Sequence, residues 1–110
     1  MCIKKTDESL IVTVTGELDH HIAAKLRTKI DSRLGGEVKN IIFDFSELSF
    51  MDSSGVGMIM GRYKAVQKAG GSVIVAGATP QVERILKISG LMNIVDVTSS
   101  IGQAIEKIKG

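Results

Sequence analysis

The sequence of 110 residues has few of the residue types on which most functional classes of small protein depend. Its single cysteine, Cys2, can form neither an internal disulfide nor a thiol-based metal cluster, and one thiol suits a reducing compartment. Tryptophan is absent and aromatic residues make up 4% of the chain, which leaves few stacking platforms for single-stranded nucleic acid. The longest apolar run near the N-terminus, residues 10–12, is too short for a signal peptide or a membrane span. We therefore expect a cytoplasmic protein that does not contact a membrane.

The charges that are present are mixed in sign and mildly uneven. Residues 1–52 hold seven basic and nine acidic side chains, and residues 53–110 hold seven and three. No basic run dominates, so we expect no direct contact with nucleic acid. Hydrophobic residues make up 44% and charged residues 24%, as in ordinary globular proteins, and a chain of this length supports one core. We expect a single domain over residues 1–110.

The pattern alternates between strand-like and helix-like segments, which predicts an α/β fold. Strands are predicted at residues 2–5, 10–15, 41–43, 72–76 and 94–97. Helices are predicted between Gly16 and Gly35, between Ser53 and Gly70, from the N-cap Thr79 to Gly90, and from Ser100 onward. At 100–103, Ser-Ile-Gly-Gln has the spacing of a capping box. Together these elements predict a central mixed β-sheet of four to five strands with about four α-helices.

The predicted topology brings two polar segments to one edge of the sheet. If the strands at residues 10–15 and 40–45 are parallel neighbours, their carboxyl ends place residues 16–19 beside residues 46–53. The edge then carries a pair of hydroxyls, Ser53 and Ser54, among five carboxylates: Glu17, Asp19, Asp44, Glu47 and Asp52.

Part of this pattern has a purely structural explanation, because Asp52 or Ser53 is a suitable N-cap for the helix that follows. Capping does not explain two glycines, Gly55 and Gly57, in the first turn, where each costs up to about 1 kcal/mol relative to alanine. We interpret these small residues as keeping the helix end open to another molecule. A phosphate on a first-turn serine would meet free backbone N–H groups and the positive end of the helix dipole.

The sequence gives only weak support to a nucleotide-binding enzyme or a serine hydrolase. The spacing of Gly55, Gly57 and Gly61 loosely resembles a dinucleotide-binding loop, but it begins about ten residues past the strand and lacks the acidic residue that holds a ribose. Neither serine lies in Gly-x-Ser-x-Gly, and the only histidines, His20 and His21, fall at a predicted helix start. A small serine hydrolase stays as an alternative, but we expect no enzyme activity, no cofactor and no metal site.

The segment from Phe50 to Gly57, with its Asp-Ser-Ser-Gly core between a buried strand and a helix, resembles the STAS domain family (sulfate transporter and anti-sigma factor antagonist). Phe43–Phe45, the continuation Gly61-Arg62-Tyr63-Lys64 and the turn Gly16-Glu17-Leu18-Asp19 fit the same family. The resemblance spans essentially the whole chain. It is strongest to anti-sigma factor antagonists of endospore-forming bacteria.

This resemblance implies partner switching. The unphosphorylated protein binds an anti-sigma factor that is also a serine kinase, and so releases the sigma factor. The kinase then phosphorylates Ser54, and a serine phosphatase reverses the modification. Expected partner contacts are Glu17, Asp19, Asp52, Ser53, Ser54 and Gly55. The resemblance implies control of the sporulation sigma factor F, with general stress signalling as the alternative pathway.

Overall fold

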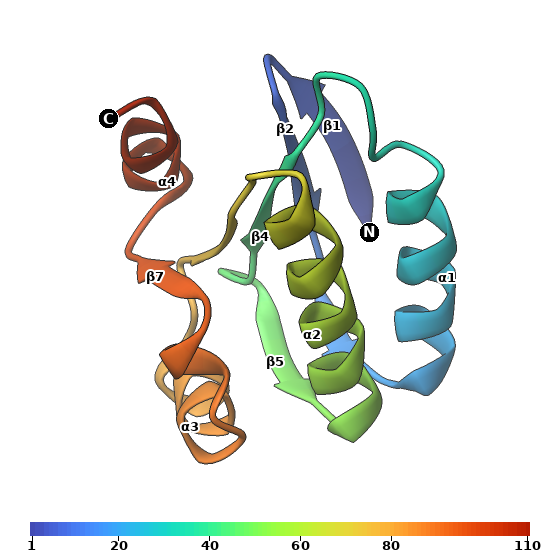
Figure 1. Ribbon diagram of the computed structural model, residues 1–110. Coiled ribbons are helices and arrows are strands. Elements are labelled where there is room, and N and C mark those ends of the chain that lie inside the picture. Colours follow the sequence, from blue (N-terminus) through green and yellow to red (C-terminus); the bar gives the residue numbers. More distant parts are fainter.

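The computed structural model describes all residues, 1–110, as four α-helices and seven β-strands (Figure 1). The strands are β1 (Cys2–Thr6), β2 (Ser9–Thr13), β3 (Gly16–Leu18), β4 (Asn40–Asp44), β5 (Leu48–Met51), β6 (Val73–Ala76) and β7 (Asp96–Thr98). The helices are α1 (His20–Asp31), α2 (Ser53–Lys68), α3 (Pro80–Ile88) and α4 (Ile101–Lys109), and a 3-10 turn covers Leu91–Asn93.

Five strands form the central sheet in the order β1-β2-β4-β6-β7. The edge strand β1 runs antiparallel to β2, whereas β2, β4, β6 and β7 are parallel to one another. The prediction of a mixed sheet is therefore confirmed, and so is the parallel pairing of the strands that lead into the candidate site. A second, two-stranded parallel sheet joins β3 to β5 beyond the carboxyl ends of β2 and β4.

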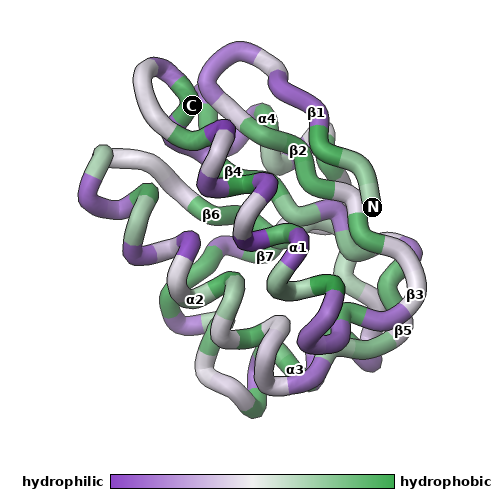
Figure 2. Tube along the Cα trace, turned by 90° about the vertical axis from the view of Figure 1, so that its right-hand side faces the viewer, coloured by the Kyte–Doolittle hydropathy of each residue, from purple (hydrophilic) through white to green (hydrophobic).

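Successive residues of β4 pack into two different apolar clusters, one on each face of the sheet. Ile41 and Phe43 of β4 belong to the main core, to which α1, α2 and α3 also contribute. Ile42 points the other way and packs with Ala104 of α4 in a smaller cluster. Figure 2 shows hydrophobic stretches along β2, β4 and β6, and a hydrophilic turn between β1 and β2. Because both faces of β4 are covered, its run of apolar residues is explained.

Helix ends follow the local capping chemistry. Thr79 accepts a hydrogen bond from the Val82 N–H, and Pro80 takes the first position of α3, as predicted. Ser100 caps α4 through the Gln103 N–H, but the Gln103 side chain accepts from Ser99, one residue before the position that a capping box requires. The prediction that α1 continues to the glycines at 35–36 is wrong, because the helix ends at Asp31 with Ser32 as its C-cap.

Candidate functional site

The amino ends of α1 and α2 lie side by side at the carboxyl edge of the sheet (Figure 1). Asp19 caps α1, where its Oδ1 accepts a hydrogen bond of 3.0 Å from the Ile22 N–H. Asp52 caps α2, where its Oδ1 accepts from the Ser54 N–H at 2.9 Å and the Gly55 N–H at 3.2 Å. Of the two candidate caps for α2, Asp52 fills the role, which leaves the Ser53 side chain exposed to solvent.

The small sheet fixes the two helix ends relative to each other. Glu17 pairs with Phe50 and Leu18 with Met51, and the Asp52 N–H donates to the Leu18 carbonyl at 3.2 Å. The sequence predicts a turn at residues 16–19 and no strand at residues 48–51, so the pairing of β3 with β5 is the feature of the site that the sequence does not reveal.

Gly55 is buried against Leu18 at this junction. A Cβ at Gly55 would lie 3.0 Å from Leu18 Cγ and 3.2 Å from the Leu18 carbonyl oxygen. Gly55 therefore has a packing role that the sequence did not predict: it lets the first turn of α2 approach β3. Its expected contact with a partner stays a prediction. Gly57, in contrast, is exposed and has open space where a Cβ would be.

Ser54 is half-buried, yet its hydroxyl is reachable from solvent. Ser54 Oγ has no hydrogen-bond partner within the chain, and it is not among the buried polar atoms that lack one, which belong to Arg62 alone. It lines an open groove between α1 and α2 together with His20, Ala23, Ala24, Arg27, Gly57, Met58, Gly61 and Arg62. A hydroxyl in this position is open to an incoming enzyme.

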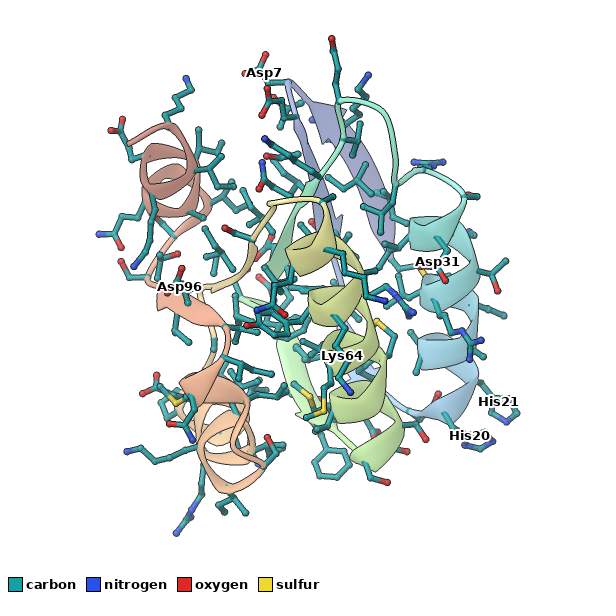
Figure 3. All side chains as sticks on the ribbon, viewed as in Figure 1. Asp7, His20, His21, Asp31, Lys64 and Asp96 are labelled. Atoms are coloured by element: carbon teal, nitrogen blue, oxygen red, sulfur yellow. The ribbon has the colours of Figure 1, made fainter.

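Two arginines, Arg27 and Arg62, also line this groove. Arg62 Nε lies 3.0 Å from Asp31 Oδ1 in an ion pair, and Arg62 Nη1 is buried without a partner. Figure 3 shows His20 and His21 at one end of α1 and Asp31 toward its other end. Both histidines are exposed, as expected for a helix start, and His20 shares the groove with Ser54.

The capping geometry corrects one expectation about phosphate at this site. The Ser54 and Gly55 N–H groups are bound by the Asp52 carboxylate, and the Val56 N–H donates to the Asp52 carbonyl. These groups are therefore not free to receive a phosphate. A phosphoryl group on Ser54 would have to extend into the groove or the solvent.

Three of the predicted carboxylates form what we call the acidic rim: Glu17, Asp19 and Asp52. Backbone hydrogen bonding from Ile22, with the nearby histidines, lowers the pKa of Asp19 below its ordinary value and outweighs desolvation. Asp44 lies at the same edge, but it bonds to Thr13 and Ser46 and faces a different groove, beside Gly77 and Ser100. Glu47 is exposed, and its carbonyl receives the Gly16 N–H.

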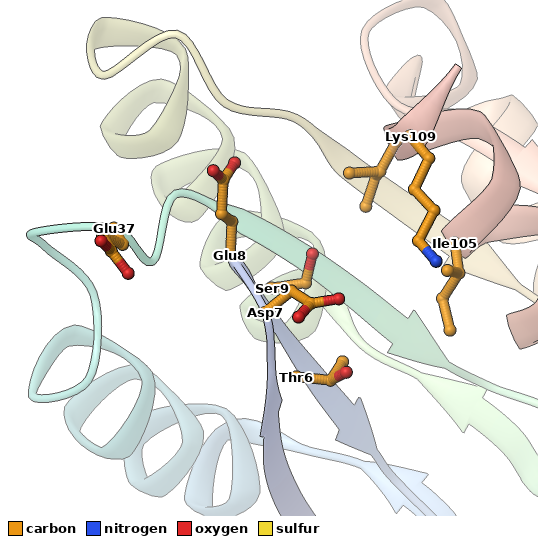
Figure 4. Close-up of a pocket in the computed structure, with 8 residues that line it drawn as sticks. Thr6, Asp7, Glu8, Ser9, Glu37, Ile105 and Lys109 are labelled. Carbon is orange, nitrogen blue, oxygen red and sulfur yellow. The ribbon is translucent and has the colours of Figure 1, made fainter.

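The surface has a second hollow at the opposite edge of the sheet, between the β1–β2 turn and α4 (Figure 4). Asp7, Glu8, Glu37 and Lys109 contribute charges of both signs to it, and Ile105 and Ile108 give it an apolar wall. No three histidine, cysteine or carboxylate side chains gather as a metal site would require. None of the helices combines the length and the apolar character that crossing a bilayer demands.

Comparisons with known proteins agree with the fold of the chain. The family model described as the STAS domain matches residues 1–104. An anti-sigma F factor antagonist from Paenibacillus polymyxa is 37% identical, over 91% of this chain and 86% of the relative. The chain is also similar to the anti-sigma factor antagonist SpoIIAA in two solved forms. The unphosphorylated form has a TM-score of 0.80 and 30% identity, over 99% of this chain and 97% of the other. The phosphorylated form, from Bacillus, has a TM-score of 0.79 and 33% identity, over 97% of each chain.

Proposed function

Because the chain belongs to the STAS domain family, among its anti-sigma factor antagonists, which are regulatory proteins and not enzymes, we propose that it works by partner switching. In its unphosphorylated form it binds a kinase-type anti-sigma factor and thereby releases the sigma factor. The kinase phosphorylates Ser54 and so ends the interaction, and a serine phosphatase restores it. The protein acts in the cytoplasm.

The observation that carries this proposal is the accessibility of Ser54 Oγ at the junction of two capped helices. The hydroxyl is not engaged by the protein, and the neighbouring Ser53 hydroxyl and acidic rim give an incoming partner polar groups to recognise. The similarity to SpoIIAA, which has been solved in a phosphorylated form, supports the same kind of modification here.

Charge alone is sufficient to operate the switch. Phosphorylation adds about −1.5 to −2 charge units at pH 7. Asp52 already occupies two N–H groups of the first turn, so this added charge gains no compensation from them. A partner whose surface fits the neutral hydroxyl would have to desolvate an unpaired phosphate, which costs several kcal/mol. A thousandfold loss of affinity requires only about 4 kcal/mol.

The proposed partners follow from this chemistry. The kinase must present cationic groups opposite the acidic rim, with Glu17, Asp19, Asp52 and Ser53 as its contacts around Ser54. The relationship to the Paenibacillus polymyxa protein, which is named for antagonising an anti-sigma F factor, favours the sporulation sigma factor F over a general stress sigma factor.

The direct test is mass spectrometry after incubation with ATP and the anti-sigma F factor that the Paenibacillus polymyxa relative antagonises. We expect one phosphoryl group on the wild-type protein, none on Ser54→Ala, and one on Ser53→Ala. Label that persists in Ser54→Ala would move the site, and label lost only in Ser53→Ala would move it to Ser53. If only an anti-sigma factor of a general stress pathway modifies the protein, the assignment to sigma F is wrong.

A further inference from the structure

Phe50 is the one phenylalanine of this chain that the core does not use. Its exposed fraction is 46%, whereas Phe43 and Phe45 are completely buried. On β5 the inward positions are taken by Leu48 and Met51, both 1% exposed. The ring of Phe50 is therefore presented to solvent by a strand whose packing is already complete.

The position of Phe50 associates it with the candidate site. It lies two residues before Asp52 and is the register partner of Glu17 in the parallel pair of β3 and β5. The register of this pair is irregular between Gly16 and Glu17, where β5 has one extra residue. Phe50 and Glu17 are both exposed, and they occupy partner positions on the strands that lead into α2 and α1.

The strand that holds Phe50 is firmly tied. Ser49 Oγ donates to the Gly16 carbonyl at 2.9 Å, and the Gly16 N–H donates to the Glu47 carbonyl at 3.0 Å. A side chain held on a paired strand loses little conformational freedom when it is covered by a partner. An aromatic ring also has only two side-chain torsions to restrict.

We propose that Phe50 is the apolar anchor of the docking surface for the kinase, an inference that rests on the proposed function. Protein interfaces typically have an aromatic or aliphatic centre enclosed by a polar rim, and a few such anchors carry most of the affinity. Phe50 supplies the centre here, and the acidic rim supplies the edge. The matching surface is an apolar socket flanked by cationic side chains, on the same face of the kinase that reaches Ser54.

The ordinary size of a protein–protein interface supports the assignment of Phe50 to the docking surface. An interface of ordinary size covers about 800 Å² on each partner, a patch roughly 30 Å across. Three residues separate Phe50 from Ser54, and part of that path is the first turn of a helix. A kinase that places its active site over Ser54 therefore covers Phe50 as well.

The test compares Phe50→Ala with a matched control, Ile108→Ala, which removes a partly exposed apolar side chain from α4 on the other side of the sheet. Binding to the anti-sigma F factor of Paenibacillus polymyxa is measured by titration calorimetry in the presence of ADP. We expect Phe50→Ala to raise Kd about tenfold to thirtyfold, as for a moderate interface hot spot, and Ile108→Ala to leave it within about twofold. In the phosphorylation assay, Phe50→Ala should raise KM and leave kcat unchanged.

Thermal unfolding of each variant shows whether a loss of binding comes from a loss of the folded state. Phe50→Thr, which suits an exposed strand position, is measured beside Phe50→Ala and should weaken binding equally, whereas Phe50→Leu should retain most of the affinity. If wild type binds and both Phe50→Ala and Phe50→Thr bind within about twofold of it, the anchor is refuted and the proposed function stands. If wild type itself fails to bind or to be phosphorylated, the proposed function fails.

Discussion

At the scale of single residues, two aspartates carry both the structure and the charge of the site. Asp19 and Asp52 each accept hydrogen bonds from the first turn of their helix. Asp52 places its negative charge against Ser54, and Asp19 places its charge at the amino end of the neighbouring helix. Their carboxylates are oriented before any partner arrives, since the capping bonds restrict their rotamers. An acidic rim that is held in this way can recognise a partner without a further ordering cost.

The titration of Asp19 tests this arrangement. The hydrogen bond from the Ile22 N–H favours the ionised carboxylate, so the pKa of Asp19 lies below its ordinary value of 3.8. With the folded pKa lowered, the stabilising contribution is fully present above the unfolded pKa and disappears as the pH falls through the folded pKa. Carboxyl ¹³C NMR should give a midpoint below 3.8, with the Ile22 amide shift following the same curve. A midpoint at or above that value would contradict the capping geometry.

At the scale of elements, α2 has two glycines near its amino end with opposite surroundings. Gly55 is pressed against Leu18, whereas Gly57 has open space in the groove. From the sequence alone the two glycines have the same expected role. Only the contact of Gly55 with Leu18 of β3 makes their roles different. The first turn of α2 is therefore a packing junction on one side and an open surface on the other.

Alanine substitution should affect these two glycines in opposite directions. Gly55→Ala forces a methyl group against Leu18 and should destabilise the fold by about 1–3 kcal/mol, as overpacked sites do. Gly57→Ala adds helix propensity without a clash and should stabilise it by up to about 1 kcal/mol. Urea unfolding of both variants measures the difference. Equal effects from the two substitutions would show that the Leu18 contact does not constrain α2.

Most of the elements could be predicted from the sequence because their signals are local. Thr79-Pro80 fixes the start of α3, and the apolar run of β4 indicates a strand covered on both faces. β3 and β5 could not be predicted, because each is only three or four residues long and their pairing is non-local. The outward-facing Phe50 also breaks the alternation that marks a strand.

The sequence could predict which residues of the candidate site lie near one another, but not which hydrogen bonds they form. Ser54, Asp19 and Asp52 could be brought together by the parallel pairing of β2 with β4. That Asp52 would use up the helix N–H groups follows from its role as N-cap, which the sequence left open between Asp52 and Ser53. The direction of Asp44 toward another groove depends on bonds to Thr13 and Ser46 that no local pattern encodes.

At the scale of the whole molecule, charge is segregated around Ser54. The acidic rim lies at the amino ends of α1 and α2, whereas the helices themselves carry six cationic side chains and one carboxylate, Asp31. Lys64 projects from α2 in Figure 3. Such a division of charge gives an approaching partner one favoured orientation, which contributes more to specificity than to affinity.

In the proposed switch, phosphorylation of Ser54 is a local event with a large effect on binding. The modification adds charge beside the rim, and nothing in the packing of the core has to change for the partner to be rejected. The fold serves as a rigid support: the sheet and its helices hold the serine, the carboxylates and Phe50 in one surface.

The most direct measurement compares the affinity of the anti-sigma F factor for unmodified protein and for protein stoichiometrically phosphorylated on Ser54. Calorimetric titration at one salt concentration should show a loss of about a thousandfold, equivalent to about 4 kcal/mol. The amide NMR spectrum should change only around Ser54. Equal affinities for the two forms would contradict the account.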